Sequence, residues 1–155
     1  MLKGQLLHPD LLRALGAAGH GAKVLLADGN YPVSIKSPPA AARIYLNLAP
    51  GIVAVTDVLK ALVATIPIEA AEVMVPDEGP EPPIFEEFRT ILRDATTLQA
   101  VAPGGGRPHE LQPLGRFAFY DAASQPDVAV AVATGEQRIY ANILLTIGVV
   151  APDEM

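Results

Sequence analysis

The feature that most constrains the fold is a short apolar segment inside the stretch GHGAKVLLADGNYP, residues 19–32. Four consecutive apolar residues occupy positions 24–27, with Gly21 before them and the pair Asp28-Gly29 after them. An uninterrupted apolar run between turn signals is typical of a strand that is buried on both faces of a sheet. We therefore predict a strand over residues 23–27, in a sheet that helices cover on both sides.

The rest of the chain alternates between helical and extended patterns. Helices are predicted over residues 9–18, 56–66, 85–95 and 116–123, and further strands over 42–48, 71–75, 128–134 and 140–150. Strands that alternate with helices of this length indicate a three-layer α/β/α fold with a mostly parallel central sheet. The last two strands are close enough in sequence to form a C-terminal antiparallel hairpin on that sheet. We expect one domain over residues 1–155, with exposed loops at 76–83 and 102–108.

Composition excludes several classes of protein. Half of the 155 residues are apolar, which favours one globular domain with a sizeable core. The formal net charge of −6, with only 11 Lys and Arg residues, argues against a nucleic-acid partner. No apolar run has the length of a membrane helix and no signal-peptide pattern is present, so we expect no membrane association and a cytoplasmic location. The absence of cysteine excludes disulfides, thiolate metal sites and a cysteine nucleophile.

Neither glycine-rich stretch fits a nucleotide site. The spacing Gly16-x-x-Gly19-x-Gly21 follows a predicted helix and precedes a strand, the reverse of the order in a dinucleotide-binding loop. The glycine run at 104–106 has no Lys-Ser/Thr after it, so it is not a phosphate-binding loop. No pair of histidines or carboxylates stands at metal-ligand spacing, and we expect neither a metal nor a cofactor.

Two titratable residues flank the predicted central strand. His20 lies between two glycines, which leave room for a ligand, and histidine is the side chain whose ordinary pKa, about 6.5, suits proton exchange near neutrality. A histidine just after a helix can also simply interact with the helix dipole. Asp28 follows the strand at the edge where open α/β sheets bind ligands, although an Asp-Gly pair is also common turn chemistry.

Polar side chains near the C-terminus offer further binding groups. Tyr140 and Asn142 are two residues apart in a predicted strand, so their side chains are expected on one face, where they suit a polyol ligand. A solvent-facing edge strand would have the same pattern. Arg116 is a lone cation before an aromatic segment, and it is either a binding group or an ordinary surface residue.

Five motifs together resemble the D-ribose pyranase / L-fucose mutarotase family. They are Gly19-His20-Gly21, Asp28 with Tyr31-Pro32, the segment RFAFY at 116–120, the segment TGE at 134–136 and the segment YANILL at 140–145. The resemblance extends from Met1 to about Val150. Arg116 followed by Phe-Ala-Phe-Tyr is similar to the fucose branch, because the ribose branch commonly has a histidine there.

The resemblance implies a cofactor-free isomerase that interconverts the α and β anomers of a monosaccharide by acid/base ring opening and reclosure. The expected monosaccharide is L-fucose. It implies His20 as the proton donor and Asp28, Arg116, Tyr140, Ala141 and Asn142 as substrate-binding positions. It also implies a ring-shaped homo-oligomer, often a decamer, in which one subunit completes its neighbour's site. The chain departs from the pattern in two ways. The fucose enzymes have a histidine where this chain has Asn30, and the family tends to have an acidic pair where this chain has Ala22-Lys23.

The predicted strand separates His20 from Asp28. Five residues at about 3.3 Å each hold the two ends roughly 17 Å apart. Either the flanking loops fold back over the sheet, or the two groups serve different parts of the pocket together with a neighbouring subunit's residues. For this reason we predict that Asp28 binds substrate and is not the direct partner of His20. Either Tyr140 or Tyr120 could carry the second proton. The alternatives are D-ribose pyranase-type activity on another sugar, a non-enzymatic monosaccharide-binding oligomer and a purely structural ring.

Overall fold

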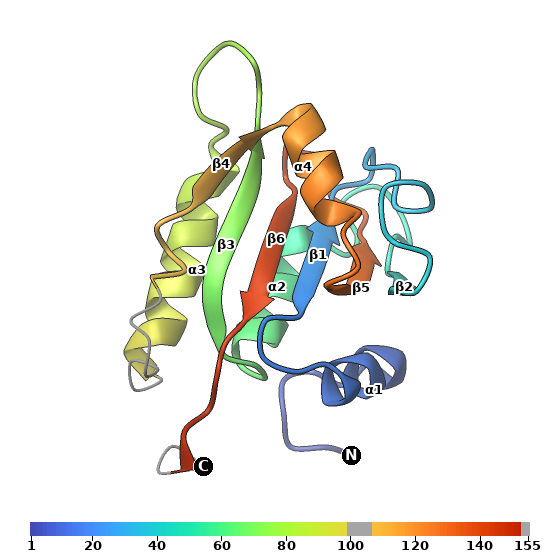
Figure 1. Ribbon diagram of the computed structural model, residues 1–155, viewed down its shortest axis with the longest axis vertical. Coiled ribbons are helices and arrows are strands. Elements are labelled where there is room, and N and C mark those ends of the chain that lie inside the picture. Colours follow the sequence, from blue (N-terminus) through green and yellow to red (C-terminus); the bar gives the residue numbers. More distant parts are fainter. Residues whose placement is uncertain (99–106, 153–155) are drawn as a thin grey trace.

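The computed structural model describes residues 1–98 and 107–152 of the chain, so most of the predicted 102–108 loop lies outside the described residues. Six strands form one mixed sheet in the order β2-β5-β1-β6-β3-β4 (Figure 1). The strands are β1 (Lys23–Ala27), β2 (Ala42–Tyr45), β3 (Ile68–Val75), β4 (Gln112–Gly115), β5 (Val128–Ala133) and β6 (Ile143–Ile147). Within the described residues, no helix is long and apolar enough to cross a bilayer.

The sheet is mostly parallel, as predicted, and only β6 runs against the other strands. β6 pairs antiparallel with both β1 and β3, whereas β1 with β5, β2 with β5 and β3 with β4 pair in parallel. The antiparallel C-terminal strand is therefore confirmed, but its partners differ from the expected hairpin. β1 lies between β5 and β6, because the apolar β1 is buried on both faces when it occupies the centre of the sheet.

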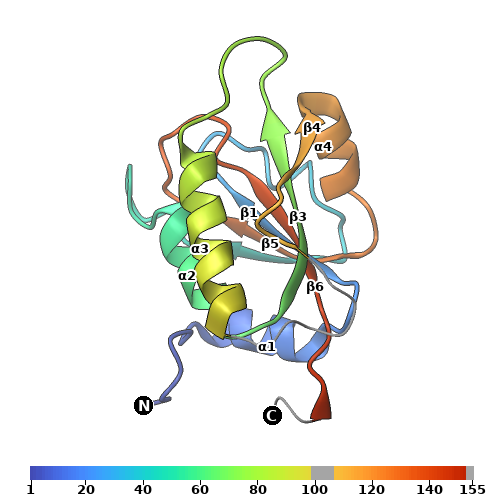
Figure 2. The ribbon, with the colours of Figure 1, turned by 90° about the vertical axis from the view of Figure 1, so that its left-hand side faces the viewer.

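Helices cover both faces of the sheet, which confirms the three-layer prediction. α1 (Pro9–Ala17), α2 (Val55–Val63) and α3 (Ile84–Leu98) contribute to the larger apolar core on one face, and α4 (Arg116–Ala123) contributes to a smaller core on the other. Figure 2 shows α2 and α3 on one side of the sheet and α4 on the opposite side. Within β1, Val24 and Leu26 belong to the first core and Leu25 and Ala27 to the second, all fully buried.

Several helix and strand bounds differ by up to three residues from the sequence prediction, and one strand was not predicted. β6 begins at Ile143 and not at residue 140, because Tyr140 has a left-handed backbone (φ 61°) that no strand can accommodate. β2 ends at Tyr45. β4 was not predicted, since Pro113 is atypical of strands; it is tolerated here because β4 is an edge strand with one free side.

The loop between β5 and β6 is tied to its surroundings on two sides. Gly135 packs so closely on the 49–52 turn that a Cβ there would collide with the carbonyl oxygens of Ala49 and Ile52. The buried Glu136 carboxylate accepts hydrogen bonds from Arg138 Nε (2.9 Å) and Nη2 (2.8 Å), and Arg138 Nη1 donates to Glu87 on α3 at 2.7 Å. These contacts fix the segment that leads to residues 140–142.

We expect Gly135→Ala to destabilise the protein by about 2 kcal/mol or more, because backbone atoms must move to admit the methyl group. Gly16→Ala is the matched control: position 16 lies in α1 with open space around a Cβ, and the change should stabilise by up to about 1 kcal/mol. Urea unfolding measures both. Equal stabilities for the two variants would contradict the close approach at Gly135.

Acid should weaken the same loop. Arg138 lowers the pKa of Glu136 from 4.5 to about 2, so its stabilisation is complete above pH 4.5 and is lost as the pH falls toward 2. Because Arg138 is partly exposed, we expect Glu136→Gln to cost roughly 1–2 kcal/mol at neutral pH. Urea unfolding at neutral pH and at pH about 3 measures the difference in unfolding free energy between the original chain and Glu136→Gln. This difference should be smaller in acid; an equal difference at both pH values would contradict the role of the Glu136–Arg138 pair.

Candidate active site

A polar cavity of about 210 Å³ lies at the carboxyl end of the parallel strands, beside α4. That volume corresponds to roughly seven water molecules, the size class of one monosaccharide. Four of the six predicted site residues line it, namely Asp28, Arg116, Tyr140 and Asn142, together with Asn30, Tyr31, Met74, Tyr120 and Ile139. The reversed direction of β6 is the reason they meet, since it sets the start of β6 beside the end of β1.

Asp28 and Asn142, 114 positions apart, form a reciprocal pair of hydrogen bonds in the wall of this cavity. The backbone N–H of Asp28 donates to Asn142 Oδ1 at 2.8 Å, and Asn142 Nδ2 donates to Asp28 Oδ2 at 3.0 Å. Both side chains are buried, with exposed fractions of 4% for Asp28 and 3% for Asn142. Because the Asn142 amide has two N–H groups and Asp28 takes one, the other is left for a ligand.

The remaining contacts of Asp28 stabilise the turn after β1. Its Oδ1 accepts hydrogen bonds from the backbone N–H groups of Asn30 (2.9 Å) and Tyr31 (3.0 Å). Burial raises the pKa of Asp28, against the effect of hydrogen bonds from Asn30, Asn142, Tyr31 and the backbone of Ala141. With its oxygens occupied in this way, Asp28 is placed to hold Asn142 and the turn in position more than to grip a ligand itself.

Arg116 and Tyr140 both line the cavity and interact with each other. Arg116 is exposed in the first turn of α4, and the Tyr140 hydroxyl is the main group that raises the pKa of its guanidinium, followed by Tyr120 and Asp77. Tyr140 does not lie in a strand as predicted, and its left-handed backbone is a strained conformation of the kind found at binding sites. Ala141 is fully buried in the larger core, so only its backbone can contribute to the site.

An aromatic group forms another wall. The Tyr31 and Tyr120 rings pack edge to face with centroids 5.5 Å apart, and Lys36 Nζ lies 5.5 Å from the centre of the Tyr120 ring. Burial raises the pKa of Tyr31, whose hydroxyl donates to the Lys36 carbonyl at 2.9 Å. The Asp28 motif pointed to Tyr31, and the aromatic run after Arg116 pointed to Tyr120. Met74 and Ile139 carried no such signal: the sheet order brings Met74 here, and Ile139 comes with the loop before Tyr140.

His20 lies at the other end of β1, away from the cavity. β1 begins beside α1, at the end of the sheet opposite α4 (Figure 1). The His20 side chain is 58% exposed, and its Nε2 is 2.9 Å from Glu69 Oε2. Gly21 after it needs a left-handed backbone (φ 80°), from which its N–H donates to Ile147 at 2.9 Å. The structure therefore confirms that His20 and Asp28 are held apart within one chain.

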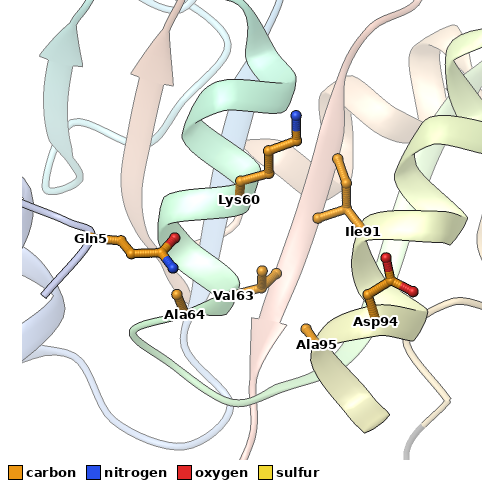
Figure 3. Close-up of a pocket in the computed structure, with 7 residues that line it drawn as sticks. All are labelled: Gln5, Lys60, Val63, Ala64, Ile91, Asp94 and Ala95. Carbon is orange, nitrogen blue, oxygen red and sulfur yellow. The ribbon is translucent and has the colours of Figure 1, made fainter. Parts of the chain in front are cut away.

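A separate cavity of about 480 Å³ lies between α2 and α3 (Figure 3). Val63, Ala64, Ile91 and Ala95 give it apolar walls, with Lys60 and Asp94 at the rim. None of the predicted site residues lines it. Among the residues that the structure describes, no three His, Asp or Glu side chains cluster closely enough to hold a metal ion.

Comparison with known proteins identifies relatives of the whole chain. Residues 1–150 match the model of the RbsD / FucU transport protein family. The chain is 34% identical to a fucose mutarotase of Danio rerio over 99% of this chain and 97% of that protein. It is also 34% identical to a D-ribose pyranase of Paracidovorax citrulli over 96% and 98% of the two chains.

Solved structures share the fold. A fucose mutarotase from Streptococcus pneumoniae, in complex with L-fucose, superposes with a TM-score of 0.74 at 28% identity, over 93% of this chain and 94% of that one. RbsD from Bacillus subtilis, complexed with D-ribose, superposes with a TM-score of 0.70 at 25% identity, over 97% and 100%.

The Asp28–Asn142 pair predicts an asymmetric response to isosteric changes. Asp28→Asn sets two amide N–H groups against each other in a buried site and should destabilise by about 1–3 kcal/mol. The double variant Asp28→Asn/Asn142→Asp exchanges donor and acceptor and should recover part of that loss. Asp121→Asn on the exposed face of α4 is the control, expected within about 0.5 kcal/mol of the original chain. Thermal or urea unfolding measures these variants and the single Asn142→Asp variant; a double variant whose destabilisation equals the sum of the two single changes would contradict the pairing.

Proposed function

Since the chain belongs to the RbsD / FucU transport protein family, we propose that it is a cofactor-free isomerase that interconverts the α and β anomers of a monosaccharide. L-fucose is the substrate that we propose. The observation that carries the proposal is the monosaccharide-sized cavity whose polar wall is preset by the Asp28–Asn142 hydrogen bonds. The full-length relatives named fucose mutarotase, and the similar structure that holds L-fucose, support the choice of sugar.

Anomer exchange requires proton transfers and no redox step. A base removes the proton from the anomeric hydroxyl while an acid protonates the ring oxygen, so the bond from C1 to the ring oxygen breaks and a free aldehyde forms. Rotation about the C1–C2 bond and reclosure on the other face give the opposite anomer and return both protons. Positioned acid–base groups accelerate such steps by typically about 10²–10⁴-fold.

The residues of the cavity suit the binding part of this reaction. The free N–H of Asn142, the Arg116 guanidinium and the hydroxyls of Tyr140 and Tyr120 can all donate to sugar oxygens. Asp28 acts mainly by orienting Asn142, and Ala141 contributes through its backbone. Tyr140 and Tyr120 remain the two candidates for the second proton-transfer group.

His20 would reach this cavity from a second copy of the chain. It is exposed at the amino end of the sheet, and its contact with Glu69 leaves the Nδ1 side of the ring for proton exchange. Beside the cavity at the carboxyl end, Phe117 is 75% exposed and Ile139 is 67% exposed, as an apolar contact surface requires. A head-to-tail contact between copies forms a closed ring when its rotation divides a full turn, and we propose a ring-shaped homo-oligomer of this kind, ten subunits in size, that acts in the cytoplasm.

A second candidate is D-ribose pyranase-type activity. The relative named D-ribose pyranase and the RbsD structure that holds D-ribose support it, and Asn30 lines the cavity with an amide that can bind a hydroxyl but cannot titrate. Initial exchange rates on L-fucose, D-ribose, D-galactose and L-rhamnose separate the two candidates.

NMR saturation transfer between the α and β anomeric protons of L-fucose tests the proposal. The original chain should accelerate exchange, and His20→Ala should lose about 100-fold or more while retaining its fold. Lys3→Ala, at an exposed position that does not line the cavity, is the control and should exchange at the original rate. If the original chain accelerates the anomer exchange of none of the four sugars, the protein is not a mutarotase, and a sugar-binding oligomer is favoured. Full activity of His20→Ala would contradict the role of His20 as the proton donor.

A further inference from the structure

The monosaccharide-sized cavity lies beside a second, larger one. The outer cavity has a volume of about 630 Å³, three times the 210 Å³ of the inner one. Ile139 and Tyr140 line both, so the two cavities adjoin at these two residues. The other wall of the outer cavity is the 76–83 segment, which rises above the carboxyl end of the sheet between β3 and α3 (Figure 1).

Ion pairs attach each wall of the outer cavity to α3. On one side, Arg89 donates through Nη1 and Nη2 to the two carboxylate oxygens of Glu81, at 2.6 and 2.7 Å. On the other side, Arg138 Nη1 donates to Glu87 at 2.7 Å. Four prolines, at positions 76, 80, 82 and 83, further restrict the backbone of the 76–83 segment. The cavity is thus preformed, and a ligand would not have to order its walls.

The lining of the outer cavity suits a sugar ring attached to the first. The prolines of the 76–83 segment provide an apolar surface that fits the C–H face of a pyranose. Glu78 lies at the edge with an exposed carboxylate and makes no ion pair among the described residues, so it can accept hydrogen bonds from hydroxyls. By contrast, the carboxylates of Glu81 and Glu87 already form ion pairs with Arg89 and Arg138.

We propose that this site also accepts reducing disaccharides, with the reducing ring in the inner cavity and the second ring in the outer one. The inference rests on the proposed anomer exchange, which it extends to a larger class of substrates. The chemistry is unchanged, because only the bond from C1 to the ring oxygen of the reducing ring breaks and re-forms, with the same two protons. The glycosidic bond between the rings takes no part.

The test compares L-fucose with L-fucose that carries a β-D-galactosyl group on O3 or on O4, each followed by NMR saturation transfer at the anomeric protons. We expect exchange of at least one disaccharide at a rate within about 10-fold of L-fucose. Pro80→Trp should fill the outer cavity and lower the disaccharide rate relative to the L-fucose rate by about 10-fold or more. Thr90→Trp, on an exposed part of α3 outside both cavities, is the matched control and should leave that ratio unchanged.

The outcomes separate the two proposals. Exchange of L-fucose without exchange of either disaccharide overturns the two-ring site and leaves the anomer exchange intact. Disaccharide exchange that Pro80→Trp and Thr90→Trp affect equally overturns the assignment of the second ring to the outer cavity. Failure with L-fucose itself counts against the proposed function.

Discussion

The reciprocal hydrogen bonds between Asp28 and Asn142 are the interaction on which the rest of the site depends. They join the end of β1 to the start of β6 in a buried place, where an unpaired amide or carboxylate would cost about 1–3 kcal/mol. The same carboxylate closes the turn that carries Asn30 and Tyr31. Asn142 in turn follows the strained Tyr140, whose ring borders both cavities. One buried pair therefore sets the position of most of the cavity wall.

The sequence pattern predicted those parts of the molecule that local chemistry determines. The apolar run of β1 and the pattern of α4 indicated both elements at their observed bounds, and Asp28 was expected at the carboxyl end of a central strand. The position of β6 between β1 and β3 could not be predicted, because it depends on pairing between residues more than 100 positions apart. The same long-range pairing brings Met74 to the cavity. The left-handed Tyr140 was also unforeseen, since nothing local favours that backbone for a tyrosine.

The distance between His20 and the cavity is the other main constraint. A fully buried β-strand is stiff, so its two ends cannot approach each other within one chain. The amino end of the sheet presents an exposed imidazole held by Glu69, whereas the carboxyl end presents a polar cavity flanked by the exposed Phe117 and Ile139. We propose that these two surfaces meet when copies assemble head to tail. With His20 as the proton donor, a second copy would supply it, because neither end of the sheet holds both His20 and the cavity residues.

Subunit mixing tests this central claim most directly. His20→Ala and Asn142→Ala chains should each be inactive alone, because every site lacks one group. When equal amounts are co-expressed and assemble at random, about a quarter of the sites combine an intact cavity with an intact histidine, so anomer exchange should recover to about a quarter of the original rate. Mixed oligomers that form normally and stay as inactive as the separate variants would contradict a site divided between two copies.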